Sequence, residues 1–77
     1  VQSPGVLGEK TKELILFSLV VGTRCQPCFD VHYQKALKLG IKQAELDEAA
    51  WCAIALGGAT VKMFYQENLE RLQPGQP

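Results

Sequence analysis

The sequence has no charge imbalance, no basic run and no long apolar stretch, and each absence removes a class of function. Eight basic and eight acidic residues leave a formal net charge of zero. Without a run of Lys and Arg, the electrostatic signature of a nucleic-acid-binding protein is missing. The longest mostly apolar run, Leu14 to Val21, is far shorter than the ~20 residues that span a bilayer. We therefore expect neither nucleic acid nor a membrane as a partner.

Cysteine is also scarce. Three oddly spaced cysteines are too few for the disulfide framework of a small secreted domain. No basic segment followed by an apolar stretch and a small-residue cleavage site marks a secretory signal, so the cytoplasm is the expected location. In such a chain a Cys-x-x-Cys pair is more typical of catalysis or metal binding than of a structural disulfide.

The length of 77 residues predicts a single domain spanning residues 1–77. At this size only about 60% of the unfolded chain's surface is buried on folding. Yet 47% of the residues are apolar, which is more than a small core needs. Short helical chains with this much apolar surface often complete their core with copies of themselves, so we predict a homo-oligomer.

The apolar pattern predicts an all-α fold, a small bundle of three main helices. Residues 1–8 are expected to form an irregular lead-in and residues 72–77 a flexible tail. The apolar run Leu14 to Val21 indicates a buried helix rather than a strand, because a polar turn of helix formers precedes it and no second strand is evident. The predicted helices cover about residues 9–22, 24–40 and 43–69.

The glycines within the predicted helices carry further expectations. Gly22 is expected to end the first helix. Gly57-Gly58 lies inside the third, where each glycine costs roughly 1 kcal/mol relative to alanine, and we interpret the pair as a close helix crossing rather than a break. Single side chains carry further expectations. We expect Trp51, Phe64 and Tyr65 in the core or in a subunit interface, and Cys52 to be a small buried hydrophobe. Lys35 and Lys38 are expected on a solvated helix face.

Residues 25–32, Cys-Gln-Pro-Cys-Phe-Asp-Val-His, form the motif around which the chain is organised. Pro27 is tolerated there only in the first turn of a helix, where backbone N–H groups have no internal partner. A helix through Cys28 makes Cys28 and His32 i,i+4 neighbours, about 5–6 Å apart at Cβ. Cys25 lies near the first turn of the same face. Two thiols and a base on one helical edge predict dithiol redox chemistry.

Each of these residue types fits one role in such chemistry. Cys28 is the predicted nucleophile, because the helix N-terminus and His32 one turn away both lower the pKa of its thiol. Cys25 is the predicted resolving thiol, which attacks oxidised Cys28 to close a disulfide. His32 needs an acceptor for its other ring nitrogen. Glu13, the last acidic residue before the apolar run, is a better candidate than Asp30, which points to another side of the helix.

The alternative to redox chemistry is a structural zinc site. Zinc in such sites takes four ligands, commonly from a second Cys/His pair. Cys52 is the one cysteine outside the motif and the chain has a single histidine, so the site would need Glu13 or a residue from another subunit. A redox-sensing module without turnover and a non-catalytic assembly subunit are the remaining alternatives.

Glu13, eleven further residues, and then Cys25-x-x-Cys28-x-x-x-His32 resemble the signature of the alkylhydroperoxidase D branch of the carboxymuconolactone decarboxylase superfamily. The stretch from Leu39 to Ala49 is similar to that family's turn into its next helix, and the resemblance extends over about residues 9–65. The four-residue spacing from cysteine to histidine is specific, whereas a bare Cys-x-x-Cys is a weak signal.

The resemblance implies an all-helical, oligomeric peroxidase or disulfide reductase. Cys28 would then be the peroxidatic thiol, Cys25 the resolving thiol, and His32 with Glu13 the proton relay. One difference is evident: the best-studied branch has a histidine just before the second cysteine, where this chain has Pro27, which transfers no protons. Decarboxylase members generally lack the cysteine pair, so lactone decarboxylation is not expected.

No cofactor and no resident metal are expected for this chemistry. The oxidant is left open between hydrogen peroxide, an organic hydroperoxide and a protein disulfide. The resemblance implies a thiol reductant of the dihydrolipoyl or thioredoxin-like class.

Overall fold

The computed structural model describes residues 5–73, and in this range the regular secondary structure consists of helices alone. The four helices are α1 (Glu9–Thr23), α2 (Gln26–Lys38), α3 (Gln43–Gly57) and α4 (Ala59–Leu72). The all-α prediction is therefore confirmed, but four helices replace the expected three. Leu72 is the last residue of α4, so the expectation of a tail from residue 72 is wrong at its first residue. Residues 1–4 and 74–77 of the expected lead-in and tail lie outside the described range.

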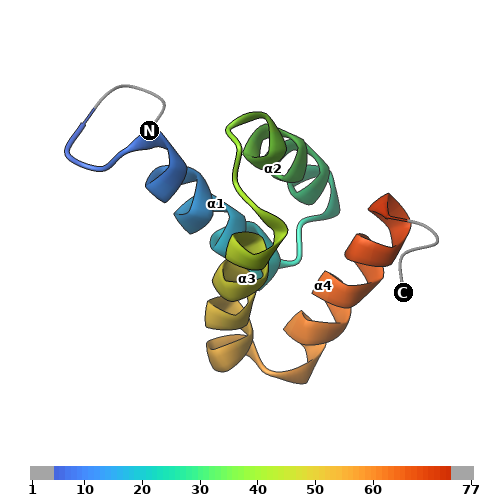
Figure 1. Ribbon diagram of the computed structural model, residues 1–77. Helices are drawn as coiled ribbons and strands as arrows, with labels where there is room; N and C mark the ends of the chain where they lie inside the picture. The colour runs from blue at the N-terminus through green and yellow to red at the C-terminus, as the bar shows by residue number, and fades with distance from the viewer. Residues whose placement is uncertain (1–4, 74–77) are drawn as a thin grey trace.

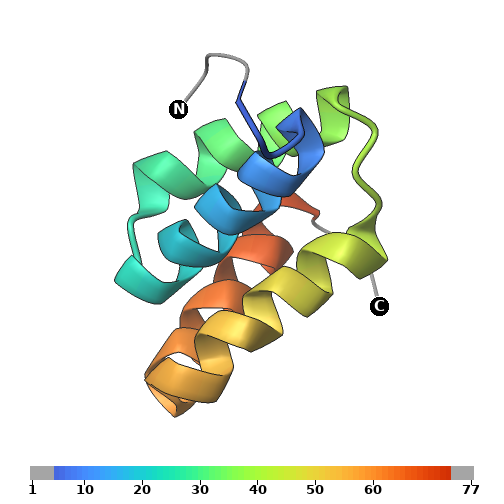
Figure 2. The ribbon, with the colours of Figure 1, turned by 90° about the vertical axis from the view of Figure 1, so that its left-hand side faces the viewer.

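Helix α1 is the central element, because it packs against each of the other three helices. Figure 1 shows α3 crossing α1 and then turning sharply into α4, which runs back beside α3. Figure 2 shows α1 and α2 lying side by side, joined by a tight turn. This pairing of α1 with α2 brings Glu13 and residues 25–32 into the same region of the molecule.

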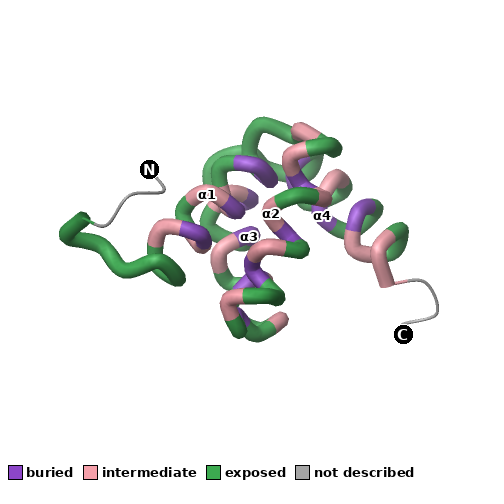
Figure 3. Tube along the Cα trace, turned by 90° about the horizontal axis from the view of Figure 1, so that it is seen from above, coloured by how far each residue is buried: buried purple, intermediate pink, exposed green. Residues whose placement is uncertain are grey.

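An aromatic cluster fills the space between the helices. Phe17 of α1 and Phe29 of α2 are fully buried, with ring centroids 5.3 Å apart. Tyr65 of α4 packs edge-on against Phe17 at 6.1 Å. Fully burying one such ring stabilises the fold by about 1.5–3 kcal/mol. Figure 3 shows the same pattern, with buried segments of each helix turned toward the centre and exposed segments outside.

The turn from α1 to α2 differs from the prediction at Gly22. The helix continues through Gly22 to Thr23, and Arg24 takes the left-handed position with φ 55°. The Arg24 N–H donates to the Val21 carbonyl at 3.2 Å, which satisfies one of the free carbonyls at the helix end. Because this cap occupies a single residue, Cys25 follows directly and becomes the N-cap of α2.

The expectation of one continuous helix through Gly57-Gly58 is wrong. Gly58 has φ 79° and ψ −156°, a conformation that essentially only glycine adopts, and it ends α3 and begins α4. Gly57 is needed for a different reason, since a Cβ at that position would lie 2.3 Å from Cγ2 of Val61. The chain therefore breaks sharply here, and α4 folds back to supply Tyr65 to the core.

Several apolar side chains lie on the surface rather than in the core. Helix α1 is not buried all round, because Ile15 and Leu19 are exposed. Trp51 is 53% exposed, so it lies outside the core of this chain, and its expected place in a subunit interface stays a prediction. Cys52 is exposed, so the expectation that it is buried is wrong. Tyr65 is buried as expected. No helix in the described range has the length and apolar character needed to cross a membrane.

Candidate active site

Cys25 and Cys28 form a disulfide at the start of α2, with their Cα atoms 5.3 Å apart. Cys25 is the N-cap, and its Sγ accepts the backbone N–H of Cys28 at 3.4 Å. Pro27 lies in the first turn, as expected, where its missing N–H removes no helical hydrogen bond. A thiolate formed at Cys25 when the disulfide opens would face this N–H group and the positive end of the helix.

Glu13 and His32 are in direct contact across the α1–α2 interface. The His32 Nδ1 and the Glu13 Oε2 are 2.7 Å apart. The Glu13 side chain is 1% exposed and that of His32 is 22% exposed, so water reaches the ring but not the carboxylate. The two helices therefore bring together two residues that are nineteen positions apart in the chain.

This contact decides which ring nitrogen is available for proton transfer. An ionised carboxylate only accepts hydrogen bonds, so Nδ1 must carry the proton and donate it to Oε2. The other nitrogen, Nε2, is then left with a free lone pair when the ring is neutral. His32 is thus oriented in the manner required of a general base.

His32 lies one helical turn after Cys28, but no hydrogen bond joins its ring to either sulfur within residues 5–73. Neither sulfur carries a proton in the disulfide, so proton transfer to the ring concerns the reduced protein and needs direct contact or an intervening water. A general base acts through one water as well as by direct contact. Both sulfur-bearing residues and His32 are partly accessible to solvent, which allows such a water to enter.

Asp30, the weaker candidate for the orienting acceptor, has a different partner. Its carboxylate pairs with the guanidinium of Arg71 in α4. Arg71 also donates to the side-chain oxygen of Asn68 at 2.7 Å. Asp30 therefore links α2 to α4 and takes no part in orienting His32.

Lys35 is a member of the site that the sequence pattern did not indicate. It was expected on a solvated face together with Lys38, yet its Nζ is 3.8 Å from Oε1 of Glu13 and its side chain is 35% exposed. Lys35 follows His32 by three residues, and residues three apart share a helix face. That spacing was the available signal, but it acquires meaning only once Glu13 is known to lie opposite.

A second polar cluster, which sequence reasoning also missed, lies between α3 and α4. The Tyr65 hydroxyl donates to Oδ1 of Asp47 at 2.5 Å, and the Gln43 amide donates to the same oxygen at 2.8 Å. Burial, reinforced by the hydrogen bond and charge of Asp47, raises the pKa of Tyr65 far above its ordinary value. This hydroxyl therefore stays protonated and serves packing rather than acid–base chemistry.

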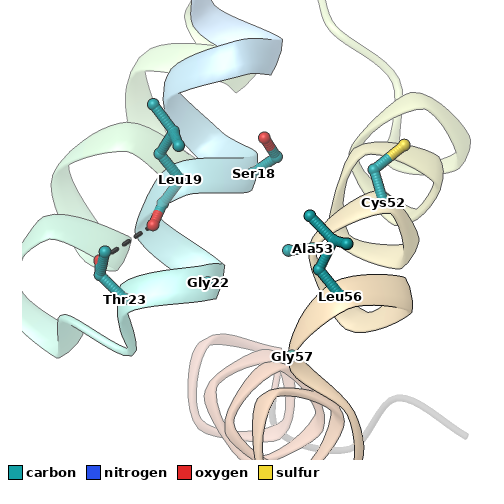
Figure 4. Close-up of a pocket in the computed structure, with 8 residues that line it drawn as sticks. All are labelled: Ser18, Leu19, Gly22, Thr23, Cys52, Ala53, Leu56 and Gly57. Carbon is teal, nitrogen blue, oxygen red and sulfur yellow. Dashed lines mark hydrogen bonds between the residues drawn. The ribbon is translucent and has the colours of Figure 1, made fainter.

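A pocket of about 400 Å³ opens between α1 and α3, away from the disulfide. Figure 4 shows side chains of Ser18 and Leu19 on one wall and of Cys52 and Leu56 on the other. Its lining is mostly apolar, and neither cysteine of the disulfide nor His32 belongs to it. The pocket is thus separate from the redox-capable residues.

Within the described part of the chain, no three His, Cys, Asp or Glu side chains are grouped so that they could hold a metal ion. The two sulfurs that zinc would need are joined to each other. The observed grouping is therefore a disulfide, a histidine and a buried carboxylate, which together suit dithiol chemistry.

No curated protein and no solved structure gives a significant match to the chain. The family model described as the carboxymuconolactone decarboxylase family matches residues 1–64, which include α1, α2, α3 and the first turns of α4. All four candidate site residues lie inside the matched range. The chain therefore belongs to the carboxymuconolactone decarboxylase family.

Proposed function

We propose that this protein is a thiol oxidoreductase of the alkylhydroperoxidase D type, which reduces peroxides through a Cys25–Cys28 dithiol/disulfide cycle. Cys28 is the peroxidatic thiol, Cys25 the resolving thiol, and His32 with Glu13 the proton relay. The observation that carries the proposal is the 2.7 Å contact between the buried Glu13 of α1 and His32 of α2. The Cys25–Cys28 disulfide lies at the start of the helix that carries His32. A merely structural disulfide has no need of an oriented base one turn away.

The proposed cycle balances in three steps. The Cys28 thiolate attacks the outer oxygen of a hydroperoxide, the O–O bond breaks, and the departing alkoxide takes a proton, which leaves a sulfenic acid and an alcohol. Cys25 then attacks the Cys28 sulfur, forming the disulfide and releasing water. Two thiols of an external reductant reopen the disulfide by exchange and become a disulfide themselves.

His32 has two tasks in this cycle. It takes the proton of the Cys28 thiol, directly or through one water, and it returns a proton to the alkoxide as the O–O bond breaks. Glu13 stabilises the imidazolium that exists between these two events. The reductant is a dithiol of the dihydrolipoyl or thioredoxin-like class, and the site of action is the cytoplasm.

Substitution of the cysteines tests the assignment. Cys28→Ser should abolish peroxide consumption in the presence of a dithiol reductant and leave the helical circular dichroism spectrum unchanged. Cys52→Ser is the matched control, because Cys52 is an exposed cysteine on α3 outside the disulfide, and it should retain full activity. A Cys28→Ser protein that consumes peroxide at the rate of the unmodified protein would refute the assignment.

The order of the two thiols is tested by trapping. Cys25→Ser removes the resolving thiol, so one equivalent of peroxide should leave Cys28 as a sulfenic acid that a dimedone-type reagent captures. Mass spectrometry of the peptide containing residues 25–32 then locates the adduct. An adduct found at Cys25 in a Cys28→Ser protein, with none at Cys28 in the Cys25→Ser protein, would reverse the two roles.

A further inference from the structure

We infer that Lys35 is a positioning residue of the relay, whose charge allows His32 to be a neutral base while the buried Glu13 stays ionised. The use of this base by the cysteines rests on the proposed function. The charge coupling between the three side chains does not, because it can be measured in the oxidised protein without any turnover.

The geometry around Glu13 leaves one of its oxygens to Lys35. Oε2 faces the His32 ring, whereas Oε1 is buried without a hydrogen-bond partner. The Lys35 ammonium lies 3.8 Å from Oε1, within ion-pair range but beyond hydrogen-bonding distance. Glu13 of α1 is therefore flanked by two side chains of α2, one on each oxygen.

Counting charges shows what Lys35 adds. When His32 is protonated, the Glu13–His32 pair is neutral as a whole, and its burial is tolerable. When His32 is neutral, the pair carries one negative charge on a side chain that is 1% exposed, and an uncompensated buried carboxylate is costly. Lys35 supplies the missing positive charge in that second state. It therefore favours release of the proton from the ring, which is the state in which His32 can accept a proton from a thiol.

Lys35 has two electrostatic effects on the pair. Its attraction for Glu13 is present whether or not the ring is charged, so it keeps the carboxylate ionised in both states of the ring. Its repulsion of the imidazolium disfavours the protonated ring directly. Removing the Lys35 charge should consequently make the pair hold its proton to higher pH.

Several other charged groups on the packed helices have positions or partners away from Glu13. On α1, the Lys10 ammonium lies 3.8 Å from the position of a Cβ at Gly40, in the turn between α2 and α3, and Glu9 is exposed. Lys12 is the neighbour of Glu13 in sequence, and adjacent residues of a helix do not face each other. From α4, Arg71 pairs with Asp30. From α3, Asp47 accepts the Tyr65 hydroxyl.

The experiment uses the single histidine of the chain, whose NMR signals need no assignment among several rings. The imidazole of His32 is titrated by ¹H–¹⁵N NMR in the disulfide form, where neither Cys25 nor Cys28 titrates. In Lys35→Met the ring should lose its proton at a pH about 0.2–0.7 unit higher than in the unmodified protein, as expected for a partly exposed ion pair. Lys35→Arg keeps the charge and should restore the original midpoint.

Lys38→Met is the matched control, because it removes the same charge from an exposed position on the same helix. It should leave the imidazole midpoint unchanged. Lys35→Gln replaces Lys35→Met as the test if the methionine variant fails to fold, since it retains a polar tip. An unchanged or lowered midpoint in the charge-free Lys35 variant, or an equal shift in Lys38→Met, would overturn the inference.

The proposed function and this inference fail in different ways. If Lys35→Met raises the imidazole midpoint but the unmodified protein consumes no peroxide, the inference stands and the proposed function fails. If peroxide is consumed and the midpoint does not respond to Lys35, the inference alone fails.

Discussion

At the scale of single residues, the site depends on one buried carboxylate. Glu13 is the only acidic side chain among the buried residues of the described range, and its cost of burial is offset by His32 and Lys35. Burial of Glu13 suits the proposed relay, because water that reached the carboxylate would compete with it for the hydrogen bond to the His32 ring. A glutamate at position 13 is thus explained by its contact with His32 and not by the apolar pattern of α1.

Replacing Glu13 by glutamine tests this role. An amide keeps the size of the side chain but neither compensates an imidazolium nor holds the ring in one tautomer, so peroxide turnover should fall by about a hundredfold. The measurement is the steady-state rate with a dithiol reductant.

Glu9→Gln is the control on the same helix, because Glu9 is exposed in the first turn of α1. It should retain the original rate. Equal rates for Glu13→Gln and the unmodified protein would show that the carboxylate has no part in proton transfer.

At the scale of the helices, two glycines show how context decides between continuation and break. Gly22 lies inside α1, where a Cβ would meet the Cβ of Ala53 at an ordinary 3.7 Å. Gly58 has φ 79° and separates α3 from α4. The sequence does not distinguish the two positions clearly, since Gly22 follows the apolar run from Leu14 to Val21 and Gly57-Gly58 follows the apolar run from Ala53 to Leu56.

Substitution by alanine should change the free energy of unfolding in opposite directions at Gly22 and Gly58. Gly22→Ala should stabilise the protein by about 0.5–1 kcal/mol, because alanine loses less backbone entropy in a helix. Gly58→Ala should destabilise it by about 1–3 kcal/mol, because a Cβ is strained in that backbone conformation. The free energy of unfolding from urea titration measures both. Changes of the same sign in the two variants would contradict the assigned helix ends.

Helix type and most helix positions could be predicted from the sequence, whereas these ends could not. The start of α2 is predicted because Pro27 marks a first turn. The start of α3 at residue 43 agrees with the expected range, and there the Glu45 carboxylate accepts the Lys42 N–H at 2.8 Å. The turn at Arg24 lacks such a signal, since a left-handed arginine has no sequence signature. The break at Gly58 depends on α4 returning to the core, which is a tertiary effect.

The candidate site was predicted in the same uneven way. The helix period alone predicts that His32 lies one turn after Cys28. In the structure Cys25 is the N-cap of α2, Cys28 lies in its first turn and His32 follows one turn later. The partnership of Glu13 with His32 was expected and is observed. The place of Lys35 was not predictable, because it depends on how closely α1 packs against α2.

At the scale of the whole molecule, several large apolar side chains of α1 and α3 are exposed. Leu19 of α1 is 57% exposed and Leu56 of α3 is 95% exposed, and both border the pocket between these helices. Trp51 of the same helix is 53% exposed. We call this surface the α1/α3 face. Exposed large apolar side chains that border a pocket, as Leu19 and Leu56 do, are typical of a protein–protein interface.

The predicted homo-oligomer can be tested at the α1/α3 face. In light scattering at micromolar concentration, the mass of the protein should be at least twice the 8.5 kDa of one chain and a whole multiple of it. Leu56→Asp should reduce that multiple, because a buried unpaired carboxylate is costly at an interface.

Val31→Asp is the control, since Val31 is also an exposed apolar side chain, at 64%, but lies on α2, outside this face. It should leave the mass unchanged. A monomeric mass for the unmodified protein at micromolar concentration would contradict the prediction of an oligomer.

The central claim is that His32 produces the thiolate of Cys28, and the pH dependence of Cys28 alkylation tests it most directly. The measurement is made on reduced protein carrying Cys25→Ser and Cys52→Ser, so that Cys28 is the only thiol. The alkylation rate should reach half its maximum well below pH ~8.5, the ordinary value for a free cysteine, and His32→Gln should move this midpoint upward. A midpoint at the ordinary value that does not respond to His32→Gln would contradict the claim.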